Sequence, residues 1–329
     1  MSDSKRVVLN GLNTREYEHS MDRMTLEALR KIPILPKLTE LVETPTSMVR
    51  RYAMLGSDLR ITERQFPSLY RTFRQACEIL EVPEPLFYVS TAPELNAYTA
   101  CPDKPIIKIY SYLLDILEED EIMFVLGHEL SHIKCRHIVY SILGELLSEG
   151  ALKIIVSTIP GLSVLYTPAE ISLNYAFYQW MRAAEYTCDR GGFLACQNFD
   201  ASCRALMKLS GYSKKYANEA NLEEFFAQAR EFDEGNEAAL GKIQQILLSF
   251  GQTHPWGVLR VRELMKFRDE GSYDKILRRE MALPPEPPPA AEETAGAAEE
   301  GSATAALKDA SGALMSSLSK VKFGNPFKK

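Results

Sequence analysis

Two histidines and a glutamate near the middle of the chain have the types and spacing of a metal-dependent hydrolytic site. The segment reads His128-Glu129-Leu130-Ser131-His132, an HExxH motif. Positions four apart on an α-helix differ by only about 40° around its axis, so both imidazoles can reach one zinc ion. Glu129 lies about 100° from His128, where its carboxylate can take a proton from an activated water and pass it to the leaving amine. The motif therefore predicts metal-assisted hydrolysis of an amide bond.

The residues around the motif predict a buried helix. Ile122, Leu126, Leu130 and Ile133 recur at helical spacing and form one apolar stripe. The alternative is a pair of core histidines with a surface glutamate between them. The HExxH spacing on an apolar helix favours the metal site.

A third histidine nearby is not expected to bind the metal. His137 lies nine residues after His128, about 180° around a continued helix, and would point away. The three-histidine metzincin pattern would need glycine at Cys135 and histidine at Ile138. We therefore interpret His137 as a packing or surface residue.

A third metal ligand must come from elsewhere, since catalytic zinc keeps three protein ligands and one open position. Glu185 and Asp189 lie four apart on a second predicted helix. One can ligate the metal while the other accepts a hydrogen bond from a ligand imidazole. Glu145 and Glu170 are weaker candidates, because neither has a partner carboxylate at that spacing. Without an HExxH motif, such a pair would indicate only a solvated helix face.

The elements that position these residues follow an α+β order. Residues 1–80 have helical periodicity, which we expect Pro33, Pro36 and Pro45 to break into short segments. Short β-type runs at 86–89, 95–98 and 106–110 predict three strands in a small sheet. Helical periodicity then dominates from about Tyr112 to about Arg279. The prediction is a mostly helical fold with a small sheet beside the HExxH helix.

Composition divides the chain into a catalytic domain and a tail. We expect the catalytic domain at 1–280, with a helical N-terminal part at 1–80 and the core at 81–280. The stretch 281–305 is rich in Pro, Ala and Glu, which predicts a flexible linker. The last segment, 306–329, has apolar residues at helical spacing beside lysines, which indicates either a basic amphipathic helix or a frayed tail.

Charge and cysteine usage exclude some classes of protein. The net charge of −6 lacks the basic excess of nucleic-acid binders. Six cysteines without a CxxC pair predict reduced thiols, and the N-terminus has no signal-peptide pattern. We therefore expect a cytoplasmic protein that does not bind nucleic acid.

One apolar stretch raises the question of membrane contact. Residues 154–169 carry no charge but contain Pro160, Gly161 and Pro168. A spanning helix needs about 20 apolar residues, so this segment is no convincing span. A buried or interfacial helical hairpin is expected at 154–169, and peripheral membrane contact of 146–180 stays open.

Four sequence elements together resemble the HtpX and CAAX-prenyl-protease family of zinc metallopeptidases, peptidase family M48, which is a gluzincin family. The elements are 95–98 (Leu-Asn-Ala-Tyr), 127–132 (Gly-His-Glu-Leu-Ser-His), 185–189 (Glu-Tyr-Thr-Cys-Asp), and 253–255 (Thr-His-Pro) followed by Arg260. The resemblance runs from about Leu80 to Leu264 and implies a zincin-like fold. Many members carry transmembrane helices, and this chain departs from them in that respect.

The resemblance also implies roles for individual residues. It implies one Zn²⁺ per chain, held by His128, His132 and Glu185, with Glu129 as the catalytic base. It implies that Asp189 does not bind the metal itself but contacts one of the metal ligands. Cys188 stands where the family commonly has alanine and adds a thiol beside a ligand.

Two further regions receive a function from the resemblance alone. His254 and Arg260 are expected to face the active site and stabilise the oxyanion. Taken without the resemblance, His254 with Pro255 indicates only a helix start. Asn96, Ala97 and Tyr98 resemble an edge strand that pairs with an extended peptide substrate, whereas by themselves they indicate an ordinary packed strand.

We therefore expect a zinc metalloendopeptidase that acts on peptide or protein substrates, with a role in protein quality control. The alternative is a catalytically silent zincin-fold module that serves as a scaffold at a membrane surface. The presence of Glu129 favours the enzyme.

Overall fold

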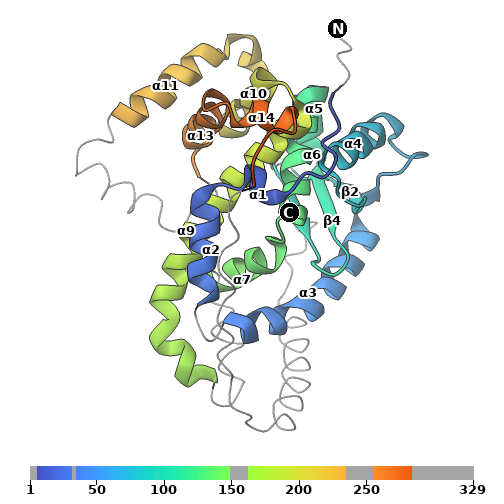
Figure 1. The fold of residues 1–329 in the computed structure, drawn as a ribbon. Helices are drawn as coiled ribbons and strands as arrows, with labels where there is room; N and C mark the ends of the chain where they lie inside the picture. The colour runs from blue at the N-terminus through green and yellow to red at the C-terminus, as the bar shows by residue number, and fades with distance from the viewer. Residues whose placement is uncertain (1–5, 32–34, 93, 149–161, 235–254, 284–329) are drawn as a thin grey trace.

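The computed structural model describes residues 6–31, 35–92, 94–148, 162–234 and 255–283. Its elements are α1 (Thr14–Tyr17), α2 (Ser20–Arg30), α3 (Leu35–Ser57), β1 (Leu59–Arg60), α4 (Pro67–Leu80), β2 (Leu86–Ser90), β3 (Ala97–Ala100), β4 (Ile106–Tyr110), α5 (Ser111–Ile116), α6 (Glu119–Lys134), α7 (Ile138–Ser148), α9 (Leu162–Cys196), α10 (Phe199–Ser210), the short 3₁₀ helix η1 (Lys214–Glu219), α11 (Leu222–Glu234), α13 (Gly257–Asp269) and α14 (Ser272–Leu277). Helices surround one small mixed sheet, which confirms the α+β prediction (Figure 1).

The sheet presents one edge strand to the HExxH helix. Among the described strands the order is β1-β2-β4-β3, with β2 parallel to β4 and the two outer strands antiparallel to their neighbours. Thr99 of β3 pairs with Ile107 of β4, and Ala97 pairs with Ile109. Ile107 and Ile109 are buried in the main core, together with Leu126 of α6. Because side chains alternate along a strand, Ala97 and Thr99 also face α6.

The sheet differs from the prediction in two respects. It has a fourth strand, β1, of only two residues, which is too short to leave an alternation pattern in the sequence. The strand predicted at 95–98 begins at Ala97 and continues to Ala100. Asn96 precedes it, and the Asn96 carbonyl accepts a hydrogen bond from the backbone N–H of Tyr110 at 3.1 Å.

The predicted break at Pro45 is wrong. Helix α3 runs through both Pro36 and Pro45. Pro36 lies in the first turn, where its missing N–H has no helical partner to lose. Pro45 removes one interior hydrogen bond, but core contacts anchor both ends of the helix. Leu38 packs in one buried cluster, and Met54 packs in another beneath the sheet.

Two helices that carry the predicted site residues cross at unusually close range. A Cβ atom added to Gly127 of α6 would lie 2.5 Å from the Cβ of Ala195 in α9. One added to Gly192 of α9 would lie 2.7 Å from the carbonyl oxygen of Phe124. Only glycine allows the backbones this close, since real Cβ atoms are not found at such distances. The crossing brings the predicted ligands of α9 beside those of α6.

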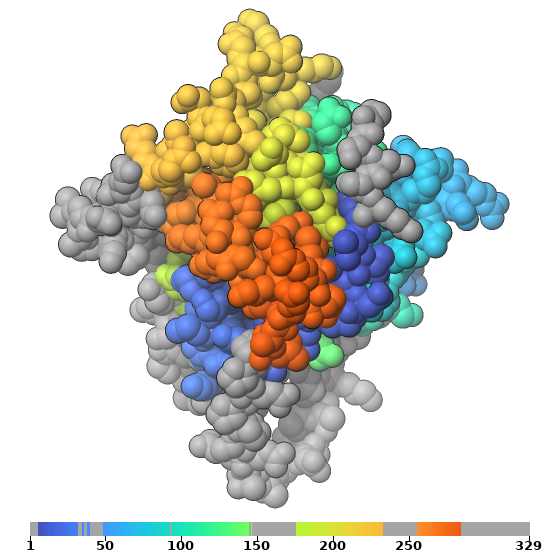
Figure 2. All heavy atoms as spheres, turned by 45° about the horizontal axis from the view of Figure 1, so that its top comes forward, coloured from blue at the N-terminus to red at the C-terminus, as the bar shows by residue number. Residues whose placement is uncertain are grey.

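The N-terminal residues pack against the last described helices. His19, just before α2, lies 3.3 Å from Glu263 of α13 between His19 Nε2 and Glu263 Oε2. Arg279 donates to Glu16 at 2.8 Å. Figure 2 shows α13 and α14, in orange, against the blue N-terminal segment. The segment around Glu16 and His19 is therefore packed into the same fold as α13 and α14.

Some predictions fall on residues that the structure does not describe. They are the linker and tail beyond residue 283, His254, and residues 154–161 of the predicted apolar hairpin. Within the described ranges, no helix has the length and apolar character that crossing a membrane requires.

Candidate metal centre and active site

The two HExxH histidines point their Nε2 atoms at one place. His128 and His132 lie one turn apart on α6, and their Nε2 atoms are 3.3 Å apart. His128 is 7% exposed, because α9 covers this face of α6. The spacing read from the sequence thus produces the expected convergence of two imidazoles.

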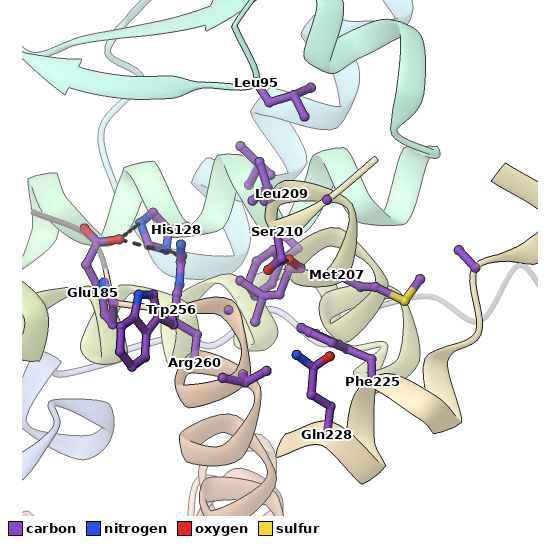
Figure 3. Close-up of a pocket in the computed structure, with 18 of the residues that line it drawn as sticks. Leu95, His128, Glu185, Met207, Leu209, Ser210, Phe225, Gln228, Trp256 and Arg260 are labelled. Carbon is purple, nitrogen blue, oxygen red and sulfur yellow. Dashed lines mark hydrogen bonds and ion pairs between the residues drawn. The ribbon is translucent and has the colours of Figure 1, made fainter. Parts of the chain in front are cut away.

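Helix α9 adds a carboxylate to this pair. Glu185 Oε2 lies 3.6 Å from Nε2 of His128, and Glu185 Oε1 lies 3.4 Å from Nε2 of His132. Two ligands of a tetrahedral zinc at about 2.0–2.1 Å are themselves about 3.3–3.4 Å apart. The three side chains therefore fit one small cation. Figure 3 shows the Glu185 carboxylate beside His128 and Arg260.

Cys188 is a second candidate for the third ligand. Its Sγ atom and one ring nitrogen from each of His128 and His132 lie within 4.8 Å of one another. Cys188 Sγ also lies 3.5 Å from Nδ1 of His137, and burial raises the pKa of the thiol well above its usual range. The distances favour Glu185.

Asp189 lies behind His128. Its Oδ1 atom is 3.0 Å from Nδ1 of His128. Arg260 of α13 donates twice to the same carboxylate, from Nη2 to Oδ1 at 2.6 Å and from Nε to Oδ2 at 2.8 Å. Burial alone would raise the pKa of Asp189, but the Arg260 guanidinium and the hydrogen bonds from Arg260 and His128 bring it below its ordinary value. An ionised Asp189 fixes the proton of His128 on Nδ1 and leaves Nε2 free for a metal.

Two of the three guanidinium nitrogens of Arg260, Nε and Nη2, donate to the Asp189 carboxylate. Nη2 also lies 3.7 Å from Glu185 Oε2, and the Arg260 side chain is 11% exposed. Arg260 lines the cleft described below, together with His128 and Glu185. Sequence reasoning placed Arg260 at the oxyanion, and the structure adds its contact with Asp189.

Glu129 has a partner that sequence reasoning missed. The Thr99 hydroxyl of β3 donates a hydrogen bond of 2.6 Å to Oε2 of Glu129. Thr99 directly follows the predicted substrate strand 96–98. Strand alternation puts it on the same face as Ala97, so a period of two could have indicated that both face α6.

A buried chain of side chains continues from His132 away from the cleft. Nδ1 of His132 lies 3.3 Å from Nδ1 of His137, and Nε2 of His137 lies 3.2 Å from Oδ2 of Asp22. His137 is a buried packing residue, one of the two roles expected for it, and it contacts the side of His132 that faces away from Glu185. The continued helix assumed for it is wrong. Helix α6 ends at Lys134, and Arg136 adopts a left-handed conformation with φ of 59°, so the chain turns back. No local pattern links Asp22, on α2, to the motif.

An open cleft passes over the metal site. A hollow of about 1010 Å³ lies on one side and one of about 250 Å³ on the other. Both are lined by His128, Glu129 and Glu185, and by Asn96 and Ala97 at the edge strand. Figure 3 shows the larger hollow, with Leu209, Met207 and Phe225 among the residues that line it. An extended chain laid along this cleft would pass over the predicted ligands and Glu129.

The remaining predicted residues have different positions. Tyr98 lines the smaller hollow only. His254 lies outside the described residues, whereas its neighbours Pro255 and Trp256 line the larger hollow. The side chains of the rival acids Glu145 and Glu170 also lie outside those described.

Comparison with known proteins identifies relatives of this chain by sequence. The model of peptidase family M48 matches residues 63–268. The Plastoglobule-localized metallopeptidase 48 of Arabidopsis thaliana is 29% identical over 276 residues, which cover 83% of this chain and 78% of the relative. A Protease HtpX homolog of Thermodesulfovibrio yellowstonii is 30% identical over 102 residues, which cover 30% of this chain and 36% of that protein.

A second Protease HtpX homolog, from Desulforapulum autotrophicum, is 26% identical over 183 residues, which cover 49% of this chain and 59% of that protein. The matched parts thus span less than two thirds of each of these two HtpX homologues. No solved structure matches the chain.

Proposed function

The chain belongs to peptidase family M48, and on that premise we propose that it is a zinc-dependent endopeptidase with a zincin-like core. The observation that carries the proposal is the convergence of His128 Nε2, His132 Nε2 and the Glu185 carboxylate, at separations of 3.3 to 3.6 Å, on an open cleft. These separations suit a tetrahedral zinc with one position left for water or substrate.

Each chemical task of such an enzyme then falls to a residue of this chain. His128, His132 and Glu185 would hold the metal. Bound zinc would act as a Lewis acid that polarises the scissile carbonyl and makes a nearby water more acidic. Glu129, beside the ligands, takes the proton from the attacking water and delivers it to the leaving amine.

Two other residues hold the site in shape. Asp189 accepts a hydrogen bond from the Nδ1–H of His128 and so fixes the orientation of that ring. Arg260 fixes Asp189 through its two hydrogen bonds. Arg260 and His254 are also proposed to stabilise the oxyanion, a role that rests on the family resemblance.

The edge strand and the cleft support peptide binding. Asn96, Ala97 and Tyr98 lie along the smaller hollow, at the edge of the sheet next to the ligands. We propose that an extended substrate pairs with this edge, since exposed strand edges offer unpaired backbone donors and acceptors. The chemistry of the site thus favours unfolded or extended segments of protein substrates.

The cellular setting of the activity is also a proposal. A cytoplasmic place, or one at a membrane surface, follows from the sequence. The Arabidopsis relative is named for plastoglobules, and this name supports a membrane-associated place. A role in protein quality control is compatible with cleavage of extended segments.

A casein-cleavage assay of the purified full chain tests the proposal against the scaffold alternative. We expect cleavage that a chelator stops, that added zinc restores, and that Glu129→Gln abolishes. A wild-type protein that binds zinc but has the same background cleavage as Glu129→Gln would instead support the silent scaffold.

A further inference from the structure

Asp22 and His137 form a buried link between the N-terminal helix α2 and the proposed ligand His132. Asp22 is fully buried at 0% exposure, and His137 is 1% exposed. Within the described residues, Asp22 lies outside the region 63–268 that the family model matches. The link therefore joins a segment beyond that match to the metal site.

Asp22 has a complete set of hydrogen-bond donors. Its Oδ1 atom accepts from Trp180 Nε1 at 2.9 Å, and its Oδ2 atom accepts from Thr187 Oγ1 at 2.6 Å. Nε2 of His137 faces the same Oδ2 atom at 3.2 Å. A buried carboxylate surrounded by three donors stays in one orientation. Asp22 is thus a fixed acceptor for His137.

The chemistry of the groups determines the direction of the hydrogen bonds. A carboxylate only accepts hydrogen bonds. Nε2 of His137 therefore carries the proton and donates a hydrogen bond to Asp22. The other ring nitrogen of His137, Nδ1, faces Nδ1 of His132 at 3.3 Å. The Cys188 thiol lies 3.5 Å from the Nδ1 atom of His137, farther than His132. In the arrangement we infer, His132 donates to that atom from its own Nδ1. Its Nε2 atom is then the unprotonated nitrogen, and this is the atom that faces Glu185 and His128.

We propose that Asp22 and His137 are positioning residues for the metal site, which select the Nε2-ligating tautomer of His132 and hold its ring in place. This inference rests on the proposed function. Each of the two proposed histidine ligands is then oriented by a buried carboxylate. His128 is held directly by Asp189, whereas His132 is held through His137 by Asp22.

The test uses the full chain and measures zinc affinity by competition with a chromophoric chelator, besides the melting temperature of the metal-free protein. His137→Phe keeps an aromatic ring beside Trp180 but has no acceptor for His132. Asp22→Asn removes the charge. Both should weaken zinc binding by about 10- to 100-fold, the usual effect of losing a group that orients a metal ligand.

Two further variants separate positioning from packing. His137→Asn can place an amide oxygen near the position of Nδ1, so it should lose less affinity than His137→Phe. Leu29 lies on the same helix, α2, and packs in a buried hydrophobic cluster. Leu29→Ala opens a cavity there and should lower the melting temperature with unchanged zinc affinity. The visible spectrum of the Co²⁺-loaded protein should change in His137→Phe and stay as in wild type in Leu29→Ala.

The outcomes distinguish this inference from the proposed function. Wild-type affinity in both His137→Phe and Asp22→Asn would overturn the positioning role. The same loss of affinity in Leu29→Ala would also overturn it, since the effect would then follow from stability. A wild-type protein that binds no zinc would instead overturn the proposed function. If His137→Phe does not fold, Asp22→Asn and His137→Asn carry the comparison.

Discussion

The hydroxyl of Thr99 donates a hydrogen bond of 2.6 Å to Oε2 of Glu129, from the edge strand to the HExxH helix. It leaves the other carboxylate oxygen to accept a proton. Both residues line the smaller hollow of the cleft. The strand next to the proposed substrate therefore also fixes the rotamer of the proposed base.

Replacing Thr99 tests this contact. Thr99→Val has nearly the same shape but no donor, and Thr99→Ser keeps the donor without the methyl group. A hydrogen bond to a charged group contributes about 1.5–3 kcal/mol, so Thr99→Val should lower kcat roughly 10- to 100-fold. KM should change little, because the contact orients a reacting group. Steady-state kinetics of both variants would refute the role if Thr99→Ser were as impaired as Thr99→Val.

The base and the ligands should respond differently to substitution. Glu129→Gln cannot accept a proton, so peptide cleavage should fall by about 10²–10⁴-fold with full metal content. Metal analysis and kinetics on one preparation check this. Loss of metal from Glu129→Gln would show that Glu129 acts as a ligand.

Glu185 and Cys188 can be separated as third ligand. Glu185→Ala should lose zinc on dialysis, because two histidines alone make an incomplete site. Cys188→Ser should keep zinc, since the Glu185 carboxylate faces both imidazoles while the Cys188 thiol contacts His137. Retention of zinc by Glu185→Ala together with its loss from Cys188→Ser would reverse the assignment.

The close crossing of α6 and α9 makes Gly192 a sensitive position. Gly192→Ala would place Cβ 2.7 Å from the carbonyl oxygen of Phe124, so the helices must separate. We expect a loss of about 1–3 kcal/mol in unfolding free energy, with weaker zinc binding. Gly56→Ala is the matched control, because nothing lies within 4 Å of its added Cβ and alanine favours helix. Denaturant unfolding of both variants measures the difference, and equal stability of the two would contradict the crossing.

Glu18 should make the fold less stable at alkaline pH. Burial, with the nearby charge of Asp22, raises the pKa of Glu18 to about 7 from an ordinary 4.5. Between these values the folded chain holds a proton that the unfolded chain has lost, so stability falls as pH rises from 4.5 to 7. Glu18→Gln removes this penalty. Its melting temperature should exceed that of wild type by about 2–4 °C at pH 8 and match it near pH 5. A difference independent of pH would exclude this cause.

Local spacing within the sequence was enough to predict the parts of the site that lie on one helix. His128 and His132 converge because a four-residue separation nearly repeats on an α-helix, whatever the surroundings. The same holds for the pair Glu185 and Asp189 on α9, both of which the structure places beside His128. The small strands at 86–90 and 106–110 also followed from their local composition.

Failures occurred where contacts between distant segments override a local rule. Pro45 does not end α3, because both ends of that helix are anchored in buried clusters. His137 does not continue the helix of His132, because the chain turns at Arg136 and returns. Helical periodicity shows which residues share a face of one continuous helix. It does not show where the chain turns after that helix ends.

The sequence by itself determined that this chain is a mostly helical α+β protein with an HExxH helix, because periodicity and the HExxH spacing are properties of neighbouring residues. Only the tertiary structure decided which distant groups complete the site. Thr99 reaches Glu129 from a strand, Arg260 reaches Asp189 from α13, and Asp22 reaches His137 from α2. Such pairs depend on the packing of whole elements, in which helix crossings permitted by residues such as Gly192 set the distances.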